Sequence, residues 1–391
     1  MNTLGTVWAA LMFVIASSSA AAQTPIESAQ QAFRDDVHAT AGLTCASCHQ
    51  RAPSAETAIA RTAVAPLCAK CHSDAAYMRG FDPQVRVDQY AQYLTSTHGK
   101  RMASGETRTA TCTDCHGAHG VRKVGDARSP VAPIRVAETC AKCHADPVRM
   151  AAFNRDPSTF NDWSQSVHAA ALLKRGDTSA PTCSTCHGSH GATPPGVAQV
   201  TNVCGQCHVR EAELFRASPK KAVFDQIGEA ECLACHSNHR IEHPTDAWVG
   251  LKDPAACATC HDATTKGADT IVTFRTDLDE LTAAIDGGAA VLRRAERAGM
   301  LVDDGRAALR EAREHQIHAR VLVHTFAVKP FQDMAGQGVR AARESDAVGE
   351  RALHDLQIRR RGLLVATIVI LGFLVTLGLK IRRLREDAGS A

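Results

Sequence analysis

The sequence predicts a mainly α-helical protein with extensive loops, followed by an antiparallel helical stalk and one transmembrane helix. Three observations indicate this architecture. All sixteen cysteines belong to one short pattern that repeats before residue 262. Apolar residues then recur at helical spacing between residues 268 and 361. Finally, residues 363–379 form an apolar, charge-free run whose length is at the lower end of what spans a bilayer.

The cysteine pattern is C-x-x-C-H, and it occurs eight times with no cysteine left over. Motifs one to eight are CASCH (45–49), CAKCH (68–72), CTDCH (112–116), CAKCH (140–144), CSTCH (183–187), CGQCH (204–208), CLACH (232–236) and CATCH (257–261). In c-type haem attachment, two thiols form thioethers with the haem and the adjacent histidine ligates the iron. Structural zinc, the alternative for C-x-x-C, does not require a histidine after every second cysteine.

The motifs therefore predict eight covalently bound haem c groups. The thiols that would attach them are Cys45, Cys48, Cys68, Cys71, Cys112, Cys115, Cys140, Cys143, Cys183, Cys186, Cys204, Cys207, Cys232, Cys235, Cys257 and Cys260. The proximal iron ligands would be His49, His72, His116, His144, His187, His208, His236 and His261. Because only 4% of the residues are aromatic, we expect the haems to supply much of the apolar interior and to fold the segment as they bind.

The motifs fall into four two-motif modules, which begin at Cys45, Cys112, Cys183 and Cys232, the first being degenerate. An electron-transfer haem usually takes a second, distal axial ligand, and histidines outside the motifs recur at fixed offsets. One set follows a motif histidine by three residues, and another lies in a Ser-x-His step ahead of the next module. The predicted distal ligands are His119, His190, His239, His98, His168 and, with a weaker pattern, His38. Three residues are too few to reach across a porphyrin, so His119 and its equivalents should serve a neighbouring module.

The fourth module departs from this pattern. Where the second and third have Ser-x-His, it has Ser218-Pro219-Lys220. Lys220 is either a solvated surface residue or a ligand made neutral by burial. If it is not a ligand, either that haem is five-coordinate or the missing ligand comes from elsewhere. We predict His324, in the apolar stretch VLVHTF, for which a satisfied core histidine is the alternative. Weaker candidates are His243, His315, His318 and methionines 78, 102 and 150.

Residues 23–265 form the predicted octahaem domain, and residues 266–361 the predicted stalk. The apolar spacing predicts a first helix through Ile271 and Ile285, loosened at Gly287-Gly288, and a turn over 298–305. A second helix should end near Lys329-Pro330, and a third should run from about Phe331 into the span. The stalk could brace the haem domain or form a subunit interface. A role near quinol is conceivable for His354, nine residues before the span.

Both ends indicate export and membrane anchoring. Residues 1–22 resemble a signal peptide with cleavage after Ala22, although no basic residue precedes the apolar run, and an uncleaved anchor is the alternative. Residues 362–380 are the predicted transmembrane helix, and 381–391 a cytoplasmic tail. Basic residues flank the run on both sides, so the need to attach haem outside the cytoplasm sets the orientation. A buried helix of a soluble domain is the alternative to a span.

At the CxxCHGxH repeats and Ser-x-His steps, residues 38–261 resemble bacterial multihaem c-type cytochromes of the cytochrome c3-like and tetrahaem cytochrome c554-like kinds. The resemblance implies closely stacked haems, mostly with two histidine ligands, that relay electrons. An eight-haem array followed by a stalk and a single span also resembles the cytochrome c subunits of quinone-linked membrane complexes.

Two classes of function follow. The first is an electron conduit on the periplasmic face of the inner membrane, between a quinol-oxidising partner of the cytochrome b type and periplasmic redox proteins. The second is a multihaem oxidoreductase of the nitrite, hydroxylamine or tetrathionate type with one open haem site. The supply of histidine nearly meets the demand and no C-x-x-C-K occurs, which favours the conduit. Lys220 is the residue that keeps the enzyme hypothesis open.

Overall fold

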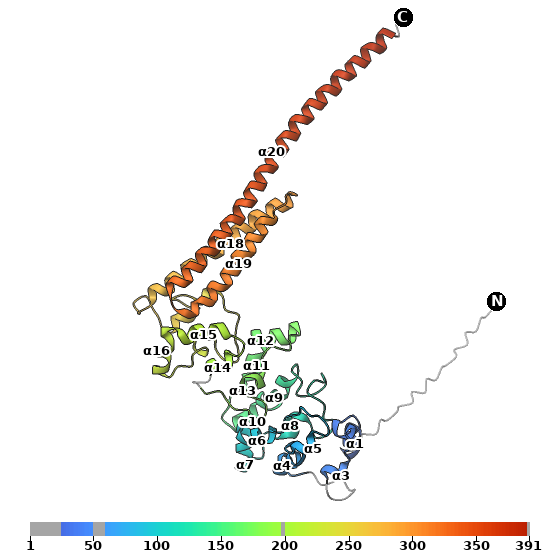
Figure 1. Ribbon diagram of the computed structural model, residues 1–391, viewed down its shortest axis with the longest axis vertical. Helices are drawn as coiled ribbons and strands as arrows, with labels where there is room; N and C mark the ends of the chain where they lie inside the picture. The colour runs from blue at the N-terminus through green and yellow to red at the C-terminus, as the bar shows by residue number, and fades with distance from the viewer. Residues whose placement is uncertain (1–24, 50–58, 197–199, 389–391) are drawn as a thin grey trace, which may run out of the picture. The chain divides into compact units, whose positions relative to one another are not determined.

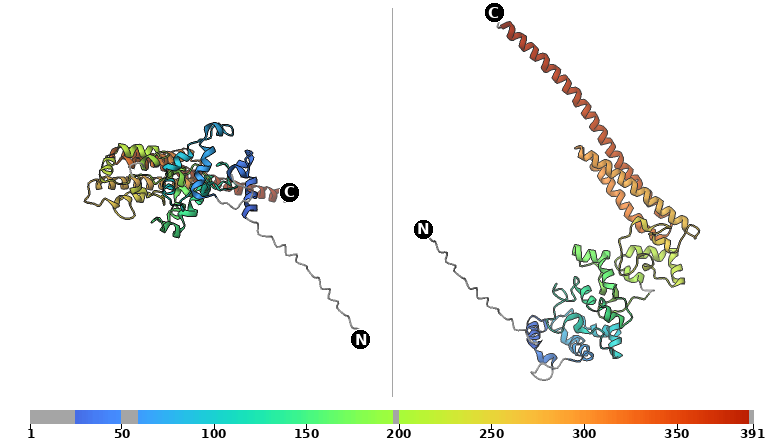
Figure 2. Two further views of the ribbon diagram at one scale, coloured as in Figure 1. Left: turned by 90° about the horizontal axis from the view of Figure 1, so that it is seen from below. Right: turned by 180° about the vertical axis from the view of Figure 1, so that it is seen from behind.

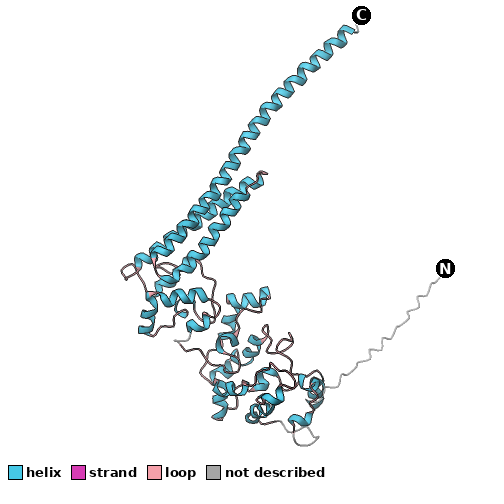
Figure 3. Cartoon of the chain, in the orientation of Figure 1, coloured by secondary structure: helices cyan, strands magenta, loops and turns pink. Residues whose placement is uncertain are grey.

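The computed structural model describes residues 25–49, 59–196 and 200–388. The predicted signal peptide, residues 1–22, and the last three residues of the predicted tail lie outside the described residues. Within the described ranges helices joined by loops are the only regular structure, as Figure 3 shows. The prediction of a mainly α-helical protein with one apolar C-terminal helix long enough to span a membrane is confirmed.

The chain divides into two compact units. The first comprises residues up to Phe160 together with Leu172–Thr193, and the second comprises Asn161–Ala171 and the rest of the chain from Pro194. Helices of the first unit are α1 (Pro25–Arg34), α2 (Val37–Thr40), α3 (Cys45–Cys48), α4 (Arg61–His72), α5 (Ala75–Met78), α6 (Gln89–Thr95), α7 (Thr97–Ala103), α8 (Cys112–His116), α9 (Val136–His144), α10 (Pro147–Ala151) and α13 (Cys183–His187).

The second unit holds most of α11 (Thr159–Ser164), and the π-helical turn η1 (Ala170–Lys174) crosses the boundary. Its other helices are α12 (Val167–Ala169), α14 (Val200–Cys204), α15 (Val209–Ala217), α16 (Pro219–Ile227), α17 (Leu233–His236), η3 (Asp246–Trp248), η4 (Ala256–Thr259), α18 (Ala268–Arg297), α19 (Asp303–Leu322), η5 (Val323–Thr325) and α20 (Val328–Ala388). The colour ramp of Figure 1 follows this order along the chain.

Helices α18, α19 and the first half of α20 lie side by side and form the stalk, as Figures 1 and 2 both show. Their shared apolar core includes Leu278, Leu281, Leu292 and Phe331, each at most 2% exposed. The residues expected on the inner face of the first helix, from Ile271 to Ile285, are indeed buried there. Burial of this continuous stripe makes the stalk a conventional helical bundle.

Two expected features of the stalk are wrong. Gly287-Gly288 does not loosen α18, which is continuous to Arg297. A Cβ on Gly288 would lie 3.0 Å from the Ala342 carbonyl oxygen, so this glycine permits close packing against α20. The second helix ends at Leu322 rather than near Pro330, because the chain reverses through η5 and Phe326, whose φ is 50°. Pro330 instead lies in the first turn of α20, where its missing N–H is tolerated.

Helix α20 continues beyond the packed part of the stalk (Figure 1). Its most apolar window has a mean hydropathy of 2.6, and none of that window is buried in the protein. The side chains there are exposed, as at Leu363 (68%) and Phe373 (66%). Such a surface needs an apolar environment, and its length suits a bilayer.

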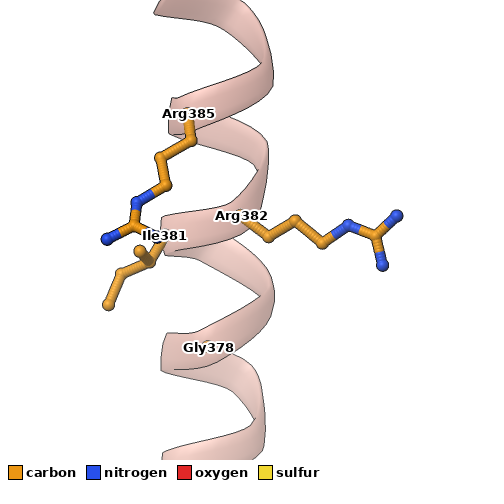
Figure 4. Close-up of a pocket in the computed structure, with 4 residues that line it drawn as sticks. All are labelled: Gly378, Ile381, Arg382 and Arg385. Carbon is orange, nitrogen blue, oxygen red and sulfur yellow. The ribbon is translucent and has the colours of Figure 1, made fainter.

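A shallow hollow of ≈ 310 Å³ follows the apolar run on α20. Gly378, Ile381, Arg382 and Arg385 line it, and all four belong to the same helix. Figure 4 shows the Arg382 side chain projecting on the opposite side of the helix from Ile381 and Arg385. Arginines that project around a helix end suit a membrane–water interface rather than a ligand site.

Candidate haem centres

Three modules begin with the same local structure at their first motif. A threonine precedes the first cysteine, and its backbone N–H donates to the side chain three residues later: Thr44 to Ser47, Thr111 to Asp114, and Thr182 to Thr185. This arrangement caps the one-turn helices α3, α8 and α13. It therefore holds both cysteines of each motif on one helical turn, with the motif histidine as its last residue in α8 and α13 and directly after it in α3.

The chain turns sharply after the motif histidine. Gly117 and Gly188 have φ of 85° and 81°, in the region that favours glycine, and Ser237 occupies the same position in the fourth module with φ of 64°. The following histidine is therefore directed away from the motif that precedes it. This explains the glycine in CHGxH and the use of the second histidine elsewhere.

A second repeated step carries the other non-motif histidines. In each module a buried residue is the N-cap of a short helix, and the second residue of that helix is the candidate distal group. In module order, the helices are α2, α7, α12 and α16, their N-caps are Asp36, Ser96, Ser166 and Ser218, and their second residues are His38, His98, His168 and Lys220. The N-cap backbone N–H donates to the carbonyl of an aromatic residue three positions earlier, which is Phe33, Tyr93, Trp163 or Phe215. The four modules thus present one side chain from the same structural position.

Six pairs of histidine rings lie together among the residues that the structure describes. Each pair joins one motif histidine to one histidine outside the motifs. The distances between ring centres are 6.0 Å for His38–His72, 6.1 Å for His49–His119, 6.1 Å for His98–His144, 6.0 Å for His116–His190, 6.3 Å for His168–His208 and 6.1 Å for His236–His324. The partners lie in the same compact unit in every case.

This spacing fits an iron between each pair. A metal ion held by two imidazole nitrogens at about 2.0 Å each separates the ring centres by roughly 6 Å. Burial lowers the pKa of His72, His98, His116, His144, His168, His190 and His236, which favours the neutral imidazole that a metal requires. No group of three or more His, Cys, Asp or Glu that could hold a metal occurs in the part of the chain described, whereas a structural zinc site needs four ligands.

Two family models match the part of the chain that holds the eight motifs. Residues 37–145 match the family model of cytochrome c3, and residues 152–261 match that of the class III cytochrome c family. Residues 37–261 are a multihaem c-type cytochrome.

One curated relative supports this assignment. The chain is 27% identical over 216 residues to Multiheme cytochrome MtrA of Shewanella baltica (strain OS185), a match that covers 53% of this chain and 53% of that protein. The chain therefore spans about half the length of the relative. No solved structure matches the chain.

The thiols of the cytochrome domain lie next to one another in motif order. Cys112 of motif three lies close to Cys68 of motif two, and this neighbouring thiol lowers the pKa of Cys112. Cys140 of motif four and Cys183 of motif five form the same contact. Burial and then the nearby Cys71 raise the pKa of Cys48, and burial and neighbours that include Cys143 raise that of Cys115, which indicates that motif one lies near motif two and motif three near motif four. Motifs one to five are thus consecutive neighbours within the first unit, and Cys235 and Cys257 relate motifs seven and eight in the same way.

Hydrogen bonds orient two of the histidines predicted as distal ligands, His38 and His324. Asp36 is 1% exposed and accepts from the Nδ1 and the backbone N–H of His38, each at 2.8 Å. His324 Nδ1 lies 2.9 Å from the Val321 carbonyl, to which it donates. Both contacts leave Nε2 free for a metal, as in metal sites where a second hydrogen bond fixes the tautomer.

A groove of ≈ 390 Å³ adjoins His236 of motif seven. It is lined by Cys235, His236, Ser237, Arg240, Glu242 and Trp248. A motif cysteine and the motif histidine therefore face the same hollow. Its volume is in the usual range for cofactor sites.

The cytochrome domain places Lys220 against a motif histidine. Its Nζ is 2.7 Å from Nε2 of His261, in motif eight, and 5.8 Å from the centre of the Phe326 ring. Burial lowers the pKa of His261, and the positive charge of Lys220 lowers it further. The Nδ1 atom of His261 is buried and has no hydrogen-bond partner. Lys220 therefore points at the eighth motif rather than into solvent.

The remaining candidates are placed as follows. His187 lies in the first unit, with Nδ1 3.3 Å from the Thr193 carbonyl, and His239 lies in the second, so both stay predictions as ligands. His243 is exposed and bonds the Pro244 carbonyl, and His315 contacts the Met334 sulfur. Met102 and Met150 are buried in packing positions. His318 and His354 are exposed on the stalk.

Sequence reasoning missed one functional residue, Asp36, and treated the first module as degenerate. The signal was present, because all four modules share one spacing. In each, an aromatic residue lies three positions before the N-cap, and the candidate distal group lies two positions after it. Aspartate in place of serine at the N-cap concealed the first copy. Both residue types cap helices well, so the substitution conserves the structure.

Proposed function

We propose that this protein is a membrane-anchored periplasmic octahaem cytochrome c, with one covalent haem c per motif. It carries electrons between a quinol-oxidising membrane partner of the cytochrome b type and periplasmic redox proteins. Each bound haem supplies a one-electron redox change at iron. The observation that carries the proposal is the pairing of six motif histidines with six others, because an iron with two protein ligands has no position left for a substrate.

The protein's own residues keep these sites rigid. Capped single-turn helices position both the motif histidines and the distal histidines, and buried N-caps fix the latter. A ligand set that barely moves lowers the reorganisation that accompanies a change of iron charge. The neighbouring thiols of motifs one to five support a haem order that follows the chain.

The distal ligands also join the modules. His119 of the second module lies against His49 of the first, and His190 of the third lies against His116 of the second. Backbone N–H groups reinforce this, since Val37 donates to Val121 O at 2.9 Å and Thr97 to Ala192 O at 3.1 Å. Each module would therefore complete a site of the one before it, which supports a continuous relay.

The membrane assignment rests on α20 and the predicted leader. Residues 363–379 contain no charged residue and no histidine, so the span itself has no ligand for a b-type haem. A separate subunit must then oxidise quinol if quinol is the donor. The predicted export of the chain and the attachment of haem c outside the cytoplasm support a periplasmic domain.

The proposal is tested with native membranes and with the purified, detergent-solubilised protein. A quinol analogue should reduce the haems in the membranes and fail to reduce them in the purified protein, as absorption at the haem α-band would show. Dithionite reduction of both samples is the control for redox-competent haem. Rapid reduction of the purified protein by the quinol would contradict the need for a partner, and failure in both preparations would contradict the quinol link.

One observation favours a second candidate, a multihaem oxidoreductase of the nitrite, hydroxylamine or tetrathionate type. Lys220 takes the place of histidine opposite His261, so motif eight lies against an amine rather than an imidazole. An EPR spectrum tests this candidate, because an enzyme of this type needs a haem site that accepts substrate. Low-spin signals that nitrite does not change would rule the enzyme out, whereas binding of nitrite alone would not establish catalysis.

A further inference from the structure

We propose that the site opposite His261 is an exchange site, at which a small lone-pair donor such as nitrite or cyanide binds in place of Lys220. The inference rests on haem attachment at motif eight, which is part of the proposed function, but not on the direction of electron flow or on the membrane partner. It assigns to Lys220 the role of a displaceable distal group.

The first support is the equivalence of position. Lys220 is the second residue of α16, after the buried N-cap Ser218, and His38, His98 and His168 are the second residues of α2, α7 and α12. The rings of those histidines lie 6.0 to 6.3 Å from the rings of His72, His144 and His208. The same structural step therefore aims Lys220 at the distal side of the eighth motif.

The second support is the contact distance. Nζ of Lys220 and Nε2 of His261 are 2.7 Å apart. Two nitrogens that share one metal ion at about 2.0 Å each are separated by about 4 Å. The amine must therefore withdraw by more than about 1 Å before both could flank the same iron. The flexible four-carbon stem of Lys220 permits this withdrawal, whereas the shorter histidine side chains at the equivalent positions already lie at the spacing that an iron requires.

The third support is the anchoring of the carrier helix. In three modules the first residue of the carrier helix donates its N–H to the next module's loop: Val37 to Val121, Thr97 to Ala192, and Val167 to Ile241. In the fourth module this residue is Pro219, which has no N–H to donate. The helix that carries Lys220 therefore lacks the hydrogen bond that fixes its equivalents.

A residue of the stalk, Phe326, lies beside this site, because no further module follows the fourth. Phe326, at the chain reversal between α19 and α20, packs against Phe215 with ring centres 6.4 Å apart and lies 5.8 Å from the Lys220 amine. Two residues earlier, His324 lies against His236 of motif seven. One short turn thus supplies a histidine to motif seven and only an aromatic cover to motif eight. That cover is apolar and offers no competing ligand.

In the exchange, the incoming ligand donates its electron pair as the Lys220 amine leaves, so no net oxidation or reduction occurs. Cyanide is the probe, and it is added to the oxidised, detergent-solubilised holoprotein while EPR spectra are recorded. Haem content and intact mass are measured on the same samples. Wild-type protein should take up one cyanide per chain, Lys220→Ala should show one high-spin haem that cyanide converts to low-spin, and Lys220→His should take up none.

Lys221→Ala is the matched control, because Lys221 is the adjacent lysine and is paired with Asp225 and Glu231 instead. It should behave as the wild type. Three results would overturn the proposal: no cyanide uptake by the wild type, equal uptake by Lys220→His, or a Lys221→Ala spectrum like that of Lys220→Ala. A mass showing fewer than eight haems, with motif eight unmodified, would refute haem attachment there and leave the other motifs untouched.

Discussion

Asp36 illustrates how a single residue can distinguish one haem from the others. Its carboxylate accepts two hydrogen bonds from His38 and a third from the Val121 N–H at 2.8 Å. The corresponding residues Ser96 and Ser166 cap their helices through hydroxyl groups that accept from Gly99 and Ala169. A carboxylate on Nδ1 makes an imidazole a more basic ligand, which stabilises the oxidised iron.

Asp36→Ser should therefore raise the reduction potential of one haem. Serine keeps the cap used by the other modules but removes the charge behind His38. We expect an upward shift of roughly 60 mV, which corresponds to about 1.4 kcal/mol for a one-electron couple. Potentiometric titration followed by optical and EPR spectra would measure it. Asp35→Asn is the control, since the neighbouring Asp35 side chain is 74% exposed; equal shifts in both variants would contradict a specific role for Asp36.

The haem ligands show what sequence can predict at the residue scale. The motif cysteines and histidines follow from local spacing, because attachment chemistry fixes them within five residues. The partner of each histidine does not follow from spacing. His119 lies beside His49, 70 positions away along the chain, and such a pairing depends on how modules pack. Sequence repetition predicted that His119 lies at a neighbouring module, but did not predict at which one.

At the scale of elements, the turn between α19 and α20 brings His324 beside His236 of motif seven. His324→Ala should convert the haem of motif seven from low-spin to high-spin, because His236 would lose the ring at 6.1 Å. The expected EPR change is one high-spin signal per chain, with the other signals retained. His318→Ala, on an exposed position of α19, should leave the spectrum unchanged. A fully low-spin spectrum in His324→Ala would show that another residue ligates this iron.

The adjacent glycines of α18 provide a matched test of stalk packing. A Cβ on Gly287 would have nothing within 4 Å, whereas one on Gly288 would lie 3.0 Å from Ala342 O and 3.2 Å from the Ser345 hydroxyl. Gly287→Ala should stabilise the helix by up to about 1 kcal/mol. Gly288→Ala should not be stabilised in this way, because α20 must shift to accommodate the added Cβ. Its free energy of unfolding should be at least about 1 kcal/mol lower than that of Gly287→Ala. Thermal unfolding by far-UV circular dichroism compares the two, and equal Tm values would argue against the close contact.

The three stalk helices were predictable from sequence, while their ends were not. Apolar spacing identified the buried face from Ile271 to Ile285 because that periodicity follows from helix geometry. Pro330 misled the prediction of the second helix end, since proline breaks a helix interior but fits a helix start. The position of the chain reversal depends on Phe326 packing against Phe215, a tertiary contact that no local pattern reveals.

For the whole molecule, the distribution of the apolar core separates two kinds of stability. The continuous core runs from Phe274 to Ala352 and lies entirely within the stalk. In the cytochrome domain, the buried apolar side chains include many alanines, such as Ala65, Ala137 and Ala169, which bury little surface. We therefore expect the stalk to fold by its own packing and the cytochrome domain to depend on its haems.

The full chain produced without haem attachment should show this difference directly. In limited proteolysis in detergent, residues 25–261 should be degraded while a stalk fragment that begins near Ala268 remains intact. The reason is that the stalk keeps its apolar core without haem, whereas the cytochrome domain does not. The holoprotein, treated in parallel, should resist cleavage in both regions, and mass spectrometry of the fragments would locate the boundary. Equal protection of the two regions in the haem-free chain would mean that the polypeptide alone organises the cytochrome domain, and that haem binds to sites already formed. Loss of both regions would mean instead that the stalk depends on the cytochrome domain, through contacts such as His324 with His236.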